Sequence, residues 1–329
     1  MGDVARLAGV SASTVSHVLN GTRNVDAATR QRVEAAITET GYRRNVVARS
    51  LAAGRTHTVG LSIAVLTNPY FGSLVHAVER ALSDAGYVLI VGDSHDDVES
   101  EKRVTDSLLD RQVDGMIVAP AAGSERITLP GITRTGTPLV LIDRSLDIGS
   151  DQVGPENFSS ARSLTEHLLA VGHRRIGIVR GIAGISSTTE RFEGYLAALA
   201  GRGIEADPAL IVDGESSTAV AERVVSSLMA GADRPTAVVS MNNSMTIGTL
   251  KALRNLGLSI PSDVAFVCYD DFEWSDLFEP KLTAAAQDVE TIGATAAQLL
   301  LRRLQGYDGA PQNIRVPTTF HHRTSCGCR

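Results

Sequence analysis

From residue 59 onward the chain alternates short apolar runs with amphipathic segments, and this alternation constrains the fold more than any other feature of the sequence. Short apolar runs predict strands that are buried on both faces, and the segments between them have the apolar spacing of helices. Parallel strands require a helical crossover, so the pattern predicts an α/β fold whose parallel sheets are covered by helices on both faces.

The alternation occurs twice along the chain. The first set predicts strands at residues 59–66, 87–91, 115–119 and 139–142, and helices at 71–85, 99–109 and 158–171. The second set predicts strands at 176–179, 210–212, 237–240, 264–269, 284–287 and 314–317, and helices at 191–200, 218–229, 245–256 and 292–304. A chain of 329 residues is long enough for several compact units, so we expect two doubly wound lobes.

The first twenty residues have a different pattern, that of two short helices joined by a tight turn. Residues 9–11, with the sequence Gly-Val-Ser, supply the corner. The apolar positions that we expect to face inward on the two helices are Val4, Leu7, Ala8, Val15, Val18 and Leu19. This spacing predicts a helix-turn-helix unit.

A third helix is expected after Asp26, which has the residue type of a helix N-cap. Its inward positions are expected at Val33, Ala36, Ile37 and Thr40. Residues 1–58 contain eight arginines and four acidic residues, a formal charge of +4, whereas the whole chain has a charge of −6. The remainder therefore has a charge of −10, and a basic head on an acidic body is typical of a small module that binds an anion such as DNA.

These motifs resemble those of the lactose-repressor/galactose-repressor family of bacterial transcription regulators. The resemblance rests on residues 3–11, 14–20 and 25–42, continues through residues 45–51, and extends more loosely to the C-terminus. It implies a helix-turn-helix head at 1–44, a hinge helix and linker at 45–57, and a two-lobed sensor similar to periplasmic sugar-binding proteins. The lobes are expected at 58–156 with 288–317, and at 157–287 with 318–329, with crossings near Glu156, Gln287 and Pro317.

The resemblance also implies a function. The chain is expected to be a homodimeric repressor that binds a near-palindromic operator in double-stranded DNA. A small effector between the lobes, a sugar or sugar derivative, is expected to control the affinity for DNA. A purine-type regulator that needs a corepressor is the alternative, and a sugar-binding protein without a DNA function is the less favoured one.

The DNA contacts are expected on the second helix and the hinge. Short side chains near the start of the second helix can approach the floor of the major groove, so we expect Ala12, Ser13 and His17 to read bases. In the family, paired hinge helices each push a leucine between base pairs of the minor groove, and the matching residue is Leu51. The remaining expected DNA contacts are Thr14, Ser16, Asn20, Asn45 and Arg49.

Effector contacts are expected just after the strands, because ligands of doubly wound sheets bind outside the carboxyl ends of the strands. Carboxylates, amides, guanidinium groups and aromatic rings together suit a ligand with many hydroxyls. The expected contacts are Asn68, Tyr70, Phe71, Asp143, Arg144, Arg191, Asn242, Asn243, Asp270, Trp274 and Gln287. Asn243 stands where the family commonly has aspartate.

The three cysteines do not predict a metal site. Cys268 lies in an apolar run and is expected to be a small buried hydrophobe. Cys326 and Cys328 follow His321 and His322, but the spacing differs from that of known zinc sites, so we expect an exposed terminus and no metal.

The sequence also lacks signals for catalysis and for membranes. It has no nucleophile elbow and no phosphate-cradling loop, so we expect neither an enzyme nor a cofactor. No apolar run approaches the roughly 18 residues of a membrane span, and the N-terminus does not read as a signal peptide. We therefore expect a cytoplasmic protein.

Overall fold

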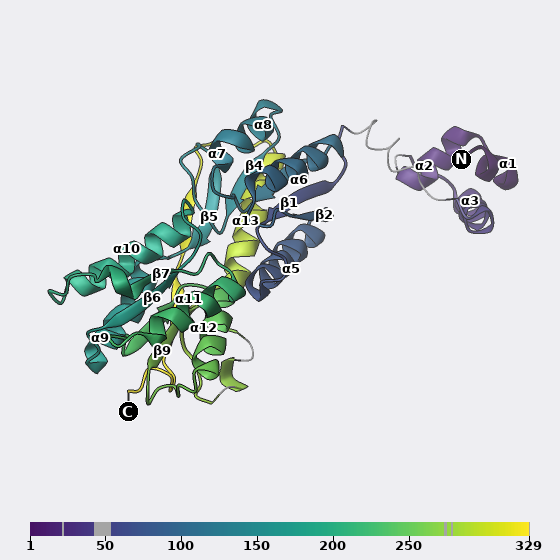
Figure 1. Ribbon diagram of the computed structural model, residues 1–329. Coiled ribbons are helices and arrows are strands. Elements are labelled where there is room, and N and C mark those ends of the chain that lie inside the picture. Colours follow the sequence, from purple (N-terminus) through teal and green to yellow (C-terminus); the bar gives the residue numbers. More distant parts are fainter. Residues whose placement is uncertain (22, 43–53, 273–274, 278, 329) are drawn as a thin grey trace. The chain divides into compact units, whose positions relative to one another are not determined.

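The computed structural model describes residues 1–21, 23–42, 54–272, 275–277 and 279–328. The chain divides into two units, a head of residues 1–56 and a body of residues 57–329 (Figure 1). Asn45, Arg49, Leu51 and Trp274, which the sequence places in binding sites, lie outside the described residues.

The head consists of α1 (Gly2–Ala8), α2 (Ala12–Asn20) and α3 (Ala27–Thr40). Gly9 ends α1 with a φ of 64°, a left-handed conformation that glycine adopts at little cost, and this confirms the predicted corner. Ser11 caps α2, where its Oγ accepts from the backbone N–H of Thr14 at 3.1 Å. Asp26 caps α3 as predicted, and its carboxylate accepts from the backbone N–H of Thr29.

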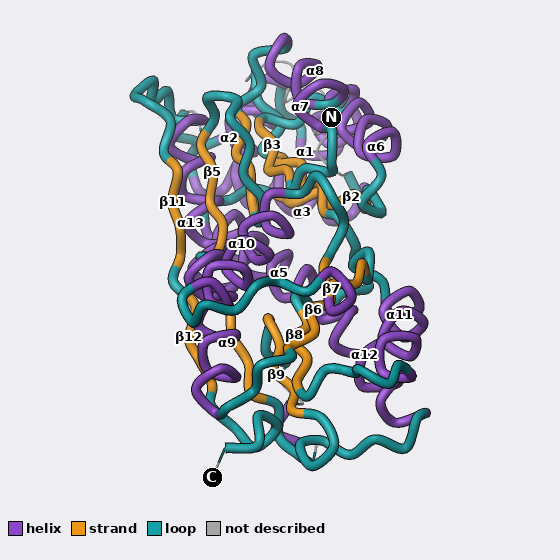
Figure 2. The backbone as a smooth tube through the Cα atoms, turned by 60° about the vertical axis from the view of Figure 1, so that its left-hand side comes forward, coloured by secondary structure: helices purple, strands orange, loops and turns teal. Residues whose placement is uncertain are grey.

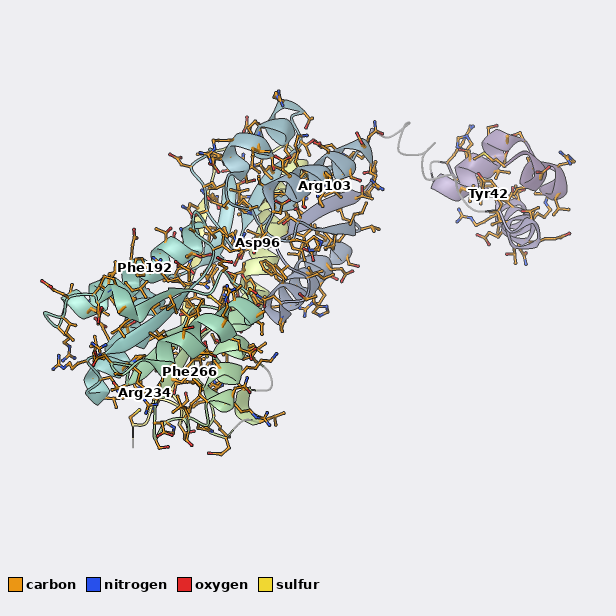
Figure 3. The ribbon with its side chains drawn as sticks, viewed as in Figure 1. Tyr42, Asp96, Arg103, Phe192, Arg234 and Phe266 are labelled. Carbon is orange, nitrogen blue, oxygen red and sulfur yellow. The ribbon has the colours of Figure 1, made fainter. Side chains whose placement is uncertain are left out.

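The core of the head differs from the prediction at Leu7 and Thr40. Leu7 is 49% exposed, and Thr40 is exposed with its hydroxyl bonded to a backbone carbonyl of its own helix. The short helix α1 packs on α3 along the edge formed by Val4, Ala5 and Ala8, so the buried stripe is rotated toward Ala5. Other side chains that pack on this core are Val10, Val15, Val18, Leu19, Val33, Ala36, Ile37 and Tyr42, the last labelled in Figure 3.

The first half of the body, the N-lobe, is a six-stranded sheet in the order β2-β1-β3-β4-β5-β11, and every pair is parallel. Helices α5 and α13 pack on one face around an apolar core, and α6 and α8 cover the other. The elements are β1 (Thr58–Ile63), α5 (Pro69–Asp84), β2 (Val88–Asp93), α6 (Val98–Asp110), β3 (Gly115–Val118), α7 (Ser124–Ile127), α8 (Leu129–Arg134), β4 (Leu139–Ile142), β5 (Asp151–Pro155), α13 (Val289–Leu304) and β11 (Asn313–Val316).

The second half, the C-lobe, repeats this plan in the order β7-β6-β8-β9-β10-β12. Its helices contact one another as two pairs, α9 with α10 and α11 with α12. The elements are α9 (Phe158–Val171), β6 (Ile176–Arg180), α10 (Ser186–Ala200), η1 (Pro208–Leu210), β7 (Ile211–Asp213), α11 (Thr218–Ala230), β8 (Ala237–Ser240), α12 (Asn243–Asn255), β9 (Ala265–Tyr269), η2 (Ser275–Leu277), β10 (Thr283–Gln287) and β12 (Thr318–His321).

One strand departs from the expected parallel order. β12 is antiparallel to β10, because the chain continues from β11 into β12 through Pro317 alone and has no room to reverse. Figure 2 shows these two strands following one another from one sheet to the other. The chain also passes between the lobes at residues 156–157 and at residue 288.

Each helix pair has a glycine where the two helices meet. A Cβ atom on Gly194 of α10 would lie 2.3 Å from the carbonyl oxygen of Phe158 in α9, and one on Gly248 of α12 would lie 2.3 Å from that of Thr218 in α11. In the N-lobe, a Cβ on Gly293 of α13 would lie 2.6 Å from the Cβ of Ala77 in α5. The helices therefore pack at distances that only glycine permits at these positions.

Among the described residues, no helix has both the length and the apolar character needed to cross a membrane.

Candidate functional site

The two lobes present their strand ends to a common cleft, and each places an aspartate there. Asp143 directly follows β4, and Asp270 directly follows β9. Both have left-handed backbones, with φ of 69° and 76°, and both are 5% exposed. Aspartate is among the few residue types that tolerate this conformation, and such strain is concentrated at functional sites.

Asp270 lies at the centre of a hydrogen-bond network. Its Oδ2 accepts from the backbone N–H of Asn243 at 3.1 Å, and its Oδ1 accepts from Nε2 of Gln287 at 2.5 Å. Burial raises the pKa of Asp270 above its ordinary value, although Arg191 and the two hydrogen bonds act in the opposite direction. The carboxylate therefore has protein partners on both oxygens.

Arg191 supplies a buried positive charge on the C-lobe side. It is 7% exposed and lies in the second turn of α10, because that helix begins at Ser186 and not at residue 191 as predicted. Its Nη1 donates to the carbonyl oxygen of Met241 at 2.6 Å, and its Nε donates to Oδ1 of Asn157 at 2.8 Å. Its guanidinium carbon lies 3.6 Å from the centre of the Tyr269 ring.

The N-lobe wall of the cleft begins at Asn68, which caps α5. Its Oδ1 accepts from the backbone N–H of Tyr70 at 3.1 Å, and Nδ2 of Asn243 donates to the same oxygen at 3.4 Å from the other lobe. Tyr70 and Phe71 are buried, and their rings meet edge to face with centres 5.1 Å apart. Burial, together with the charge of Asp143, raises the pKa of Tyr70 well above its ordinary value.

Two side-chain amides of the cleft have orientations fixed by their neighbours. Asn68 already accepts from a backbone N–H through Oδ1, so Asn243 presents its NH₂ group there, and Gln287 presents its NH₂ group to the Asp270 carboxylate. The carbonyl oxygens of Asn243 and Gln287 are buried without a hydrogen bond to any described residue, whereas the hydroxyl of Tyr70 lies beside the carboxylate of Asp143. Buried polar atoms in this condition are uncommon and need a partner.

Arg144 is committed to the N-lobe. Its Nη1 contacts the carboxylate of Asp96 at 2.5 Å and donates to the carbonyl oxygen of Pro120 at 3.0 Å, while its Nε lies 3.4 Å from Oδ2 of Asp143. Figure 3 labels Asp96 near the junction of the two halves of the body. Arg144 therefore places a positive charge beside Asp143, while its own hydrogen bonds go to other residues of the N-lobe.

The structure brings ten of the predicted effector residues to two adjoining hollows, which share Tyr70, Asp270 and Gln287. The others are Asn68, Phe71, Asp143, Arg144, Arg191, Asn242 and Asn243. Asn242 caps α12 through its side chain, which accepts from the backbone N–H of Met245 at 2.9 Å.

Sequence reasoning missed several other lining residues: Ser73, Gly181, Ile185, Ser187, Thr188, Ser216, Met241, Asp271, Phe272 and Val289. Ser216 follows β7, so the rule that ligands lie beyond strand ends contained the signal for it. Ser187 and Thr188 lie in the first turn of α10, which the sequence pattern places too late.

In the head, the start of α2 presents small groups to solvent. Ala12 and Ser13 are exposed, whereas Thr14, Ser16 and His17 are half-buried. Oγ of Ser11 lies 2.8 Å from Oγ of Ser13 and 2.9 Å from Oγ1 of Thr14. Asn20 is the last residue of α2. The exposed arginines among the described residues of the head include Arg6, Arg23, Arg30 and Arg32.

Comparison with known proteins matches both parts of the chain. Residues 1–45 match the family described as bacterial regulatory proteins, lacI family, and residues 165–326 match a periplasmic binding protein-like domain. The ribose operon repressor of Escherichia coli strain K12 is 34% identical over 327 residues, 99% of each chain. The transcriptional repressor PurR of Aliivibrio salmonicida is 32% identical over 92% of this chain and 91% of its own. The structure of the lac repressor dimer bound to operator and the anti-inducer ONPF has a TM-score of 0.87, with 28% identity and 98% coverage of both chains.

Proposed function

The chain belongs to the lacI family of bacterial regulatory proteins and is an effector-controlled transcriptional regulator, and we propose that its effector is a small polyhydroxylated molecule bound between the lobes. In this proposal the protein acts in the cytoplasm as a homodimer that represses transcription. In this role it catalyses no reaction and needs no cofactor to bind DNA or effector.

The observation that supports this effector class is the surplus of hydrogen-bond acceptors in the cleft. Asp143 and Asp270 are carboxylates, and the carbonyl oxygens of Asn243 and Gln287 are buried without a partner among the described residues. A ligand that satisfies them must donate several hydrogen bonds at once. The hydroxyls of a sugar can donate several hydrogen bonds. Each hydroxyl oxygen can also accept a hydrogen bond, and Arg191 supplies a donor for it.

A purine-type corepressor is the second candidate. PurR from Aliivibrio salmonicida is 32% identical to this chain, and the buried rings of Tyr70 and Phe71 offer an apolar wall for a flat base. Hypoxanthine presents fewer donors than a pentose does, and the donors of guanine all lie in one plane, so either base leaves more of the cleft acceptors unpaired. The polyhydroxylated ligand is therefore the better match to the side chains present.

The effector is tested by thermal unfolding and calorimetric titration of the purified protein with ribose, other pentoses and hexoses, hypoxanthine and guanine. We expect saturable binding of a sugar and a rise in melting temperature, because a ligand that binds only the folded state stabilises it. Binding of a purine alone would reject the sugar proposal and leave the regulator assignment intact. Binding of neither class would reject both candidates.

For DNA, we propose that Ala12, Ser13 and His17 read bases in the major groove, with Thr14, Ser16 and Asn20 nearer the phosphates. Asn45, Arg49 and Leu51 complete the contacts from the hinge, and Leu51 enters the minor groove. Ala12 and Ser13 are exposed at the start of α2, which supports a role for this end of the helix in contact with DNA.

The DNA proposal is tested by gel-shift titration of an operator from the protein's own genomic neighbourhood and of unrelated DNA. Leu51→Ala is expected to lower specific affinity by more than about tenfold and to change non-specific affinity little, since a wedge acts through a kinked site. Leu256→Ala, at a position that is 41% exposed in the C-lobe, serves as the control. An equal loss on both DNAs would contradict the wedge.

We further propose that the effector acts by changing how the lobes meet. Three contacts between the lobes support this: Asn68 with Asn243, Arg315 with Glu190, and the backbone N–H of Ser145 with Oγ of Ser186 at 2.9 Å. A ligand inserted at the same junction must bind the two lobe arrangements with different affinity to shift the equilibrium.

A further inference from the structure

The end of the chain forms a cluster of potential metal ligands with one helix of the C-lobe. The ligating atoms of His167 of α9, His322, Cys326 and Cys328 all lie within 4.8 Å of one another. The sequence pattern predicts an exposed terminus here, and that prediction is wrong for Ser325 and Cys326, which are fully buried, whereas His322 is exposed. His167, the ligand that completes the set, lies 155 residues before His322 in the chain.

The tail is held in place by contacts that do not involve the cluster. Oγ of Ser325 accepts from the backbone N–H of Thr283 at 2.8 Å and donates to the carbonyl oxygen of Phe266 at 2.7 Å. The guanidinium group of Arg323 makes a two-pronged ion pair with Asp271, with distances of 2.9 and 2.7 Å. The ligands are therefore brought together by the fold of the C-lobe, and a metal would find them preorganised.

A single glycine allows both cysteines to point to the same place. Gly327 has a φ of 78°, so the chain reverses between Cys326 and Cys328. On the helix side, the His167 ring packs edge to face on Phe320, with centres 5.3 Å apart, and this contact orients its Nε2 toward the cluster.

Two of the three short distances within the cluster equal those of a tetrahedral site, and the third, between His322 and Cys328, would have to lengthen when a metal binds. Nε2 of His322 lies 2.8 Å from Sγ of Cys328 and 3.4 Å from Sγ of Cys326, and Nε2 of His167 lies 3.3 Å from Sγ of Cys328. Metal–ligand lengths of about 2.3 Å for sulfur and 2.0 Å for nitrogen place tetrahedral ligand atoms roughly 3.3–3.8 Å apart. Two thiolates and two imidazoles are the ligand set of a closed structural zinc site.

We propose that His167, His322, Cys326 and Cys328 bind one Zn²⁺ ion, which fastens the C-terminal tail to α9. Each cysteine releases its thiol proton on binding, and four protein ligands leave no open position for substrate. His321 is not part of the cluster, and its Nε2 lies 3.9 Å from Oδ2 of Asp271. The zinc would secure the end of β12, the last strand to pass from one lobe to the other.

The metal content of full-length protein, reconstituted with zinc and freed of loose metal by gel filtration, tests the proposal. We expect about one zinc per chain. Cobalt-substituted protein should show the visible bands of a tetrahedral site and a thiolate-to-cobalt charge-transfer band. The double variant Cys326→Ser/Cys328→Ser and the single variant His167→Ala should lose both the zinc and the cobalt spectrum.

Two variants serve as matched controls, since each removes a residue of the same type outside the cluster. Cys268→Ala removes a buried cysteine in β9, and His321→Ala removes the histidine beside the cluster; both should keep the metal. Circular dichroism identifies any variant that fails to fold, and zinc should raise the melting temperature of the wild type but not of Cys328→Ser. The proposal would be overturned if the wild-type protein bound no stoichiometric zinc and showed no cobalt spectrum. It would also be overturned if Cys326 and Cys328 formed a disulfide that resisted reduction.

Discussion

The N-lobe and the C-lobe share a strand order but differ in their sixth strand. The N-lobe order is β2-β1-β3-β4-β5-β11, and the C-lobe order is β7-β6-β8-β9-β10-β12. In each sheet the fourth strand from this edge, β4 or β9, is followed by an aspartate with a left-handed backbone. β11 completes the N-lobe sheet in parallel, whereas β12 enters the C-lobe sheet antiparallel and leads into the tail. The repeated framework thus determines where the cleft lies, and the sixth strand determines how the lobes are linked.

The largest expected effect concerns the helix pairs that each lobe repeats. In Gly194→Ala the new methyl group meets the backbone of α9, with contacts of 2.3 Å to Phe158 O and 2.9 Å to Arg162 N. Overpacking of this kind costs roughly 1–3 kcal/mol, and we expect a loss at or above the upper end because backbone atoms cannot move aside easily. Urea unfolding of the purified protein measures it.

Gly72 provides the matched control, because it also lies in a helix, α5, but a Cβ there meets nothing within 4 Å. Gly72→Ala should raise stability by up to about 1 kcal/mol, as expected for an open helical position. If the two substitutions changed the free energy of unfolding equally, the close approach of α9 to α10 would not be what excludes a side chain at residue 194.

The second prediction compares the aspartates of the two lobes. Asp143→Asn and Asp270→Asn should each lower the affinity for the effector by about 10- to 100-fold, since a hydrogen bond to a charged group is worth about 1.5–3 kcal/mol. Asp270→Asn should change the free energy of unfolding less than the affinity, because the amide gives up a hydrogen bond from Asn243 or Gln287 but also removes a buried charge. Calorimetric titration and thermal unfolding separate the two effects. Asp84→Asn, at an exposed position, is the control.

If only one aspartate affected affinity, the effector would contact one lobe, and the proposed closure of the lobes around it would be contradicted.

The third prediction concerns pH and distinguishes Asp270 from an ordinary carboxylate. Burial raises its pKa, so it takes up a proton at a higher pH than an exposed aspartate does. The protonated form accepts fewer hydrogen bonds, and effector affinity should therefore fall on acidification at a higher pH than it would for an ordinary aspartate. The free energy of unfolding should respond in the opposite way. The folded state binds this proton more tightly than the unfolded chain does, so the contribution of Asp270 to the free energy of unfolding should rise as the pH falls. Asp270→Asn should remove this part of the pH dependence of binding; its persistence would assign the titration to another group.

The smallest expected effect is on the link between the lobes. Arg315 of β11 makes a two-pronged ion pair with Glu190 of α10, at 2.6 and 3.0 Å, and both side chains are partly exposed. Arg315→Gln should change the ratio of operator affinities with and without effector by only about two- to fivefold, as expected for a pair of up to about 1 kcal/mol. Arg162→Gln removes an exposed pair within α9 and should leave the ratio unchanged. A larger change for Arg162 would show that the ratio does not report on lobe contact.

Several elements could be predicted because their own residues specify them. β4 is a wholly apolar run and β8 is apolar up to its last residue, Ser240, and the sequence pattern predicts the limits of both strands to the residue. The cap at Asp26 depends on a residue type and its local spacing. β5 was missed because Val153 is the one strongly apolar residue in Asp151–Pro155, and this strand exists through its pairing with β4 and β11. Leu7 was misplaced because the direction in which α1 faces is set by α3, which lies far along the chain.

The same division holds for the sites. The sequence by itself determined that polar residues such as Asp143 and Asp270 follow strands, because strand and helix periods are local properties of the chain. Only the tertiary structure decided which amide oxygens of Asn243 and Gln287 lack a partner, that Arg144 is tied to Asp96, and that His167 meets Cys326 and Cys328. These outcomes depend on side chains that are distant in sequence and are brought within about 4 Å of each other by packing, which no local pattern encodes.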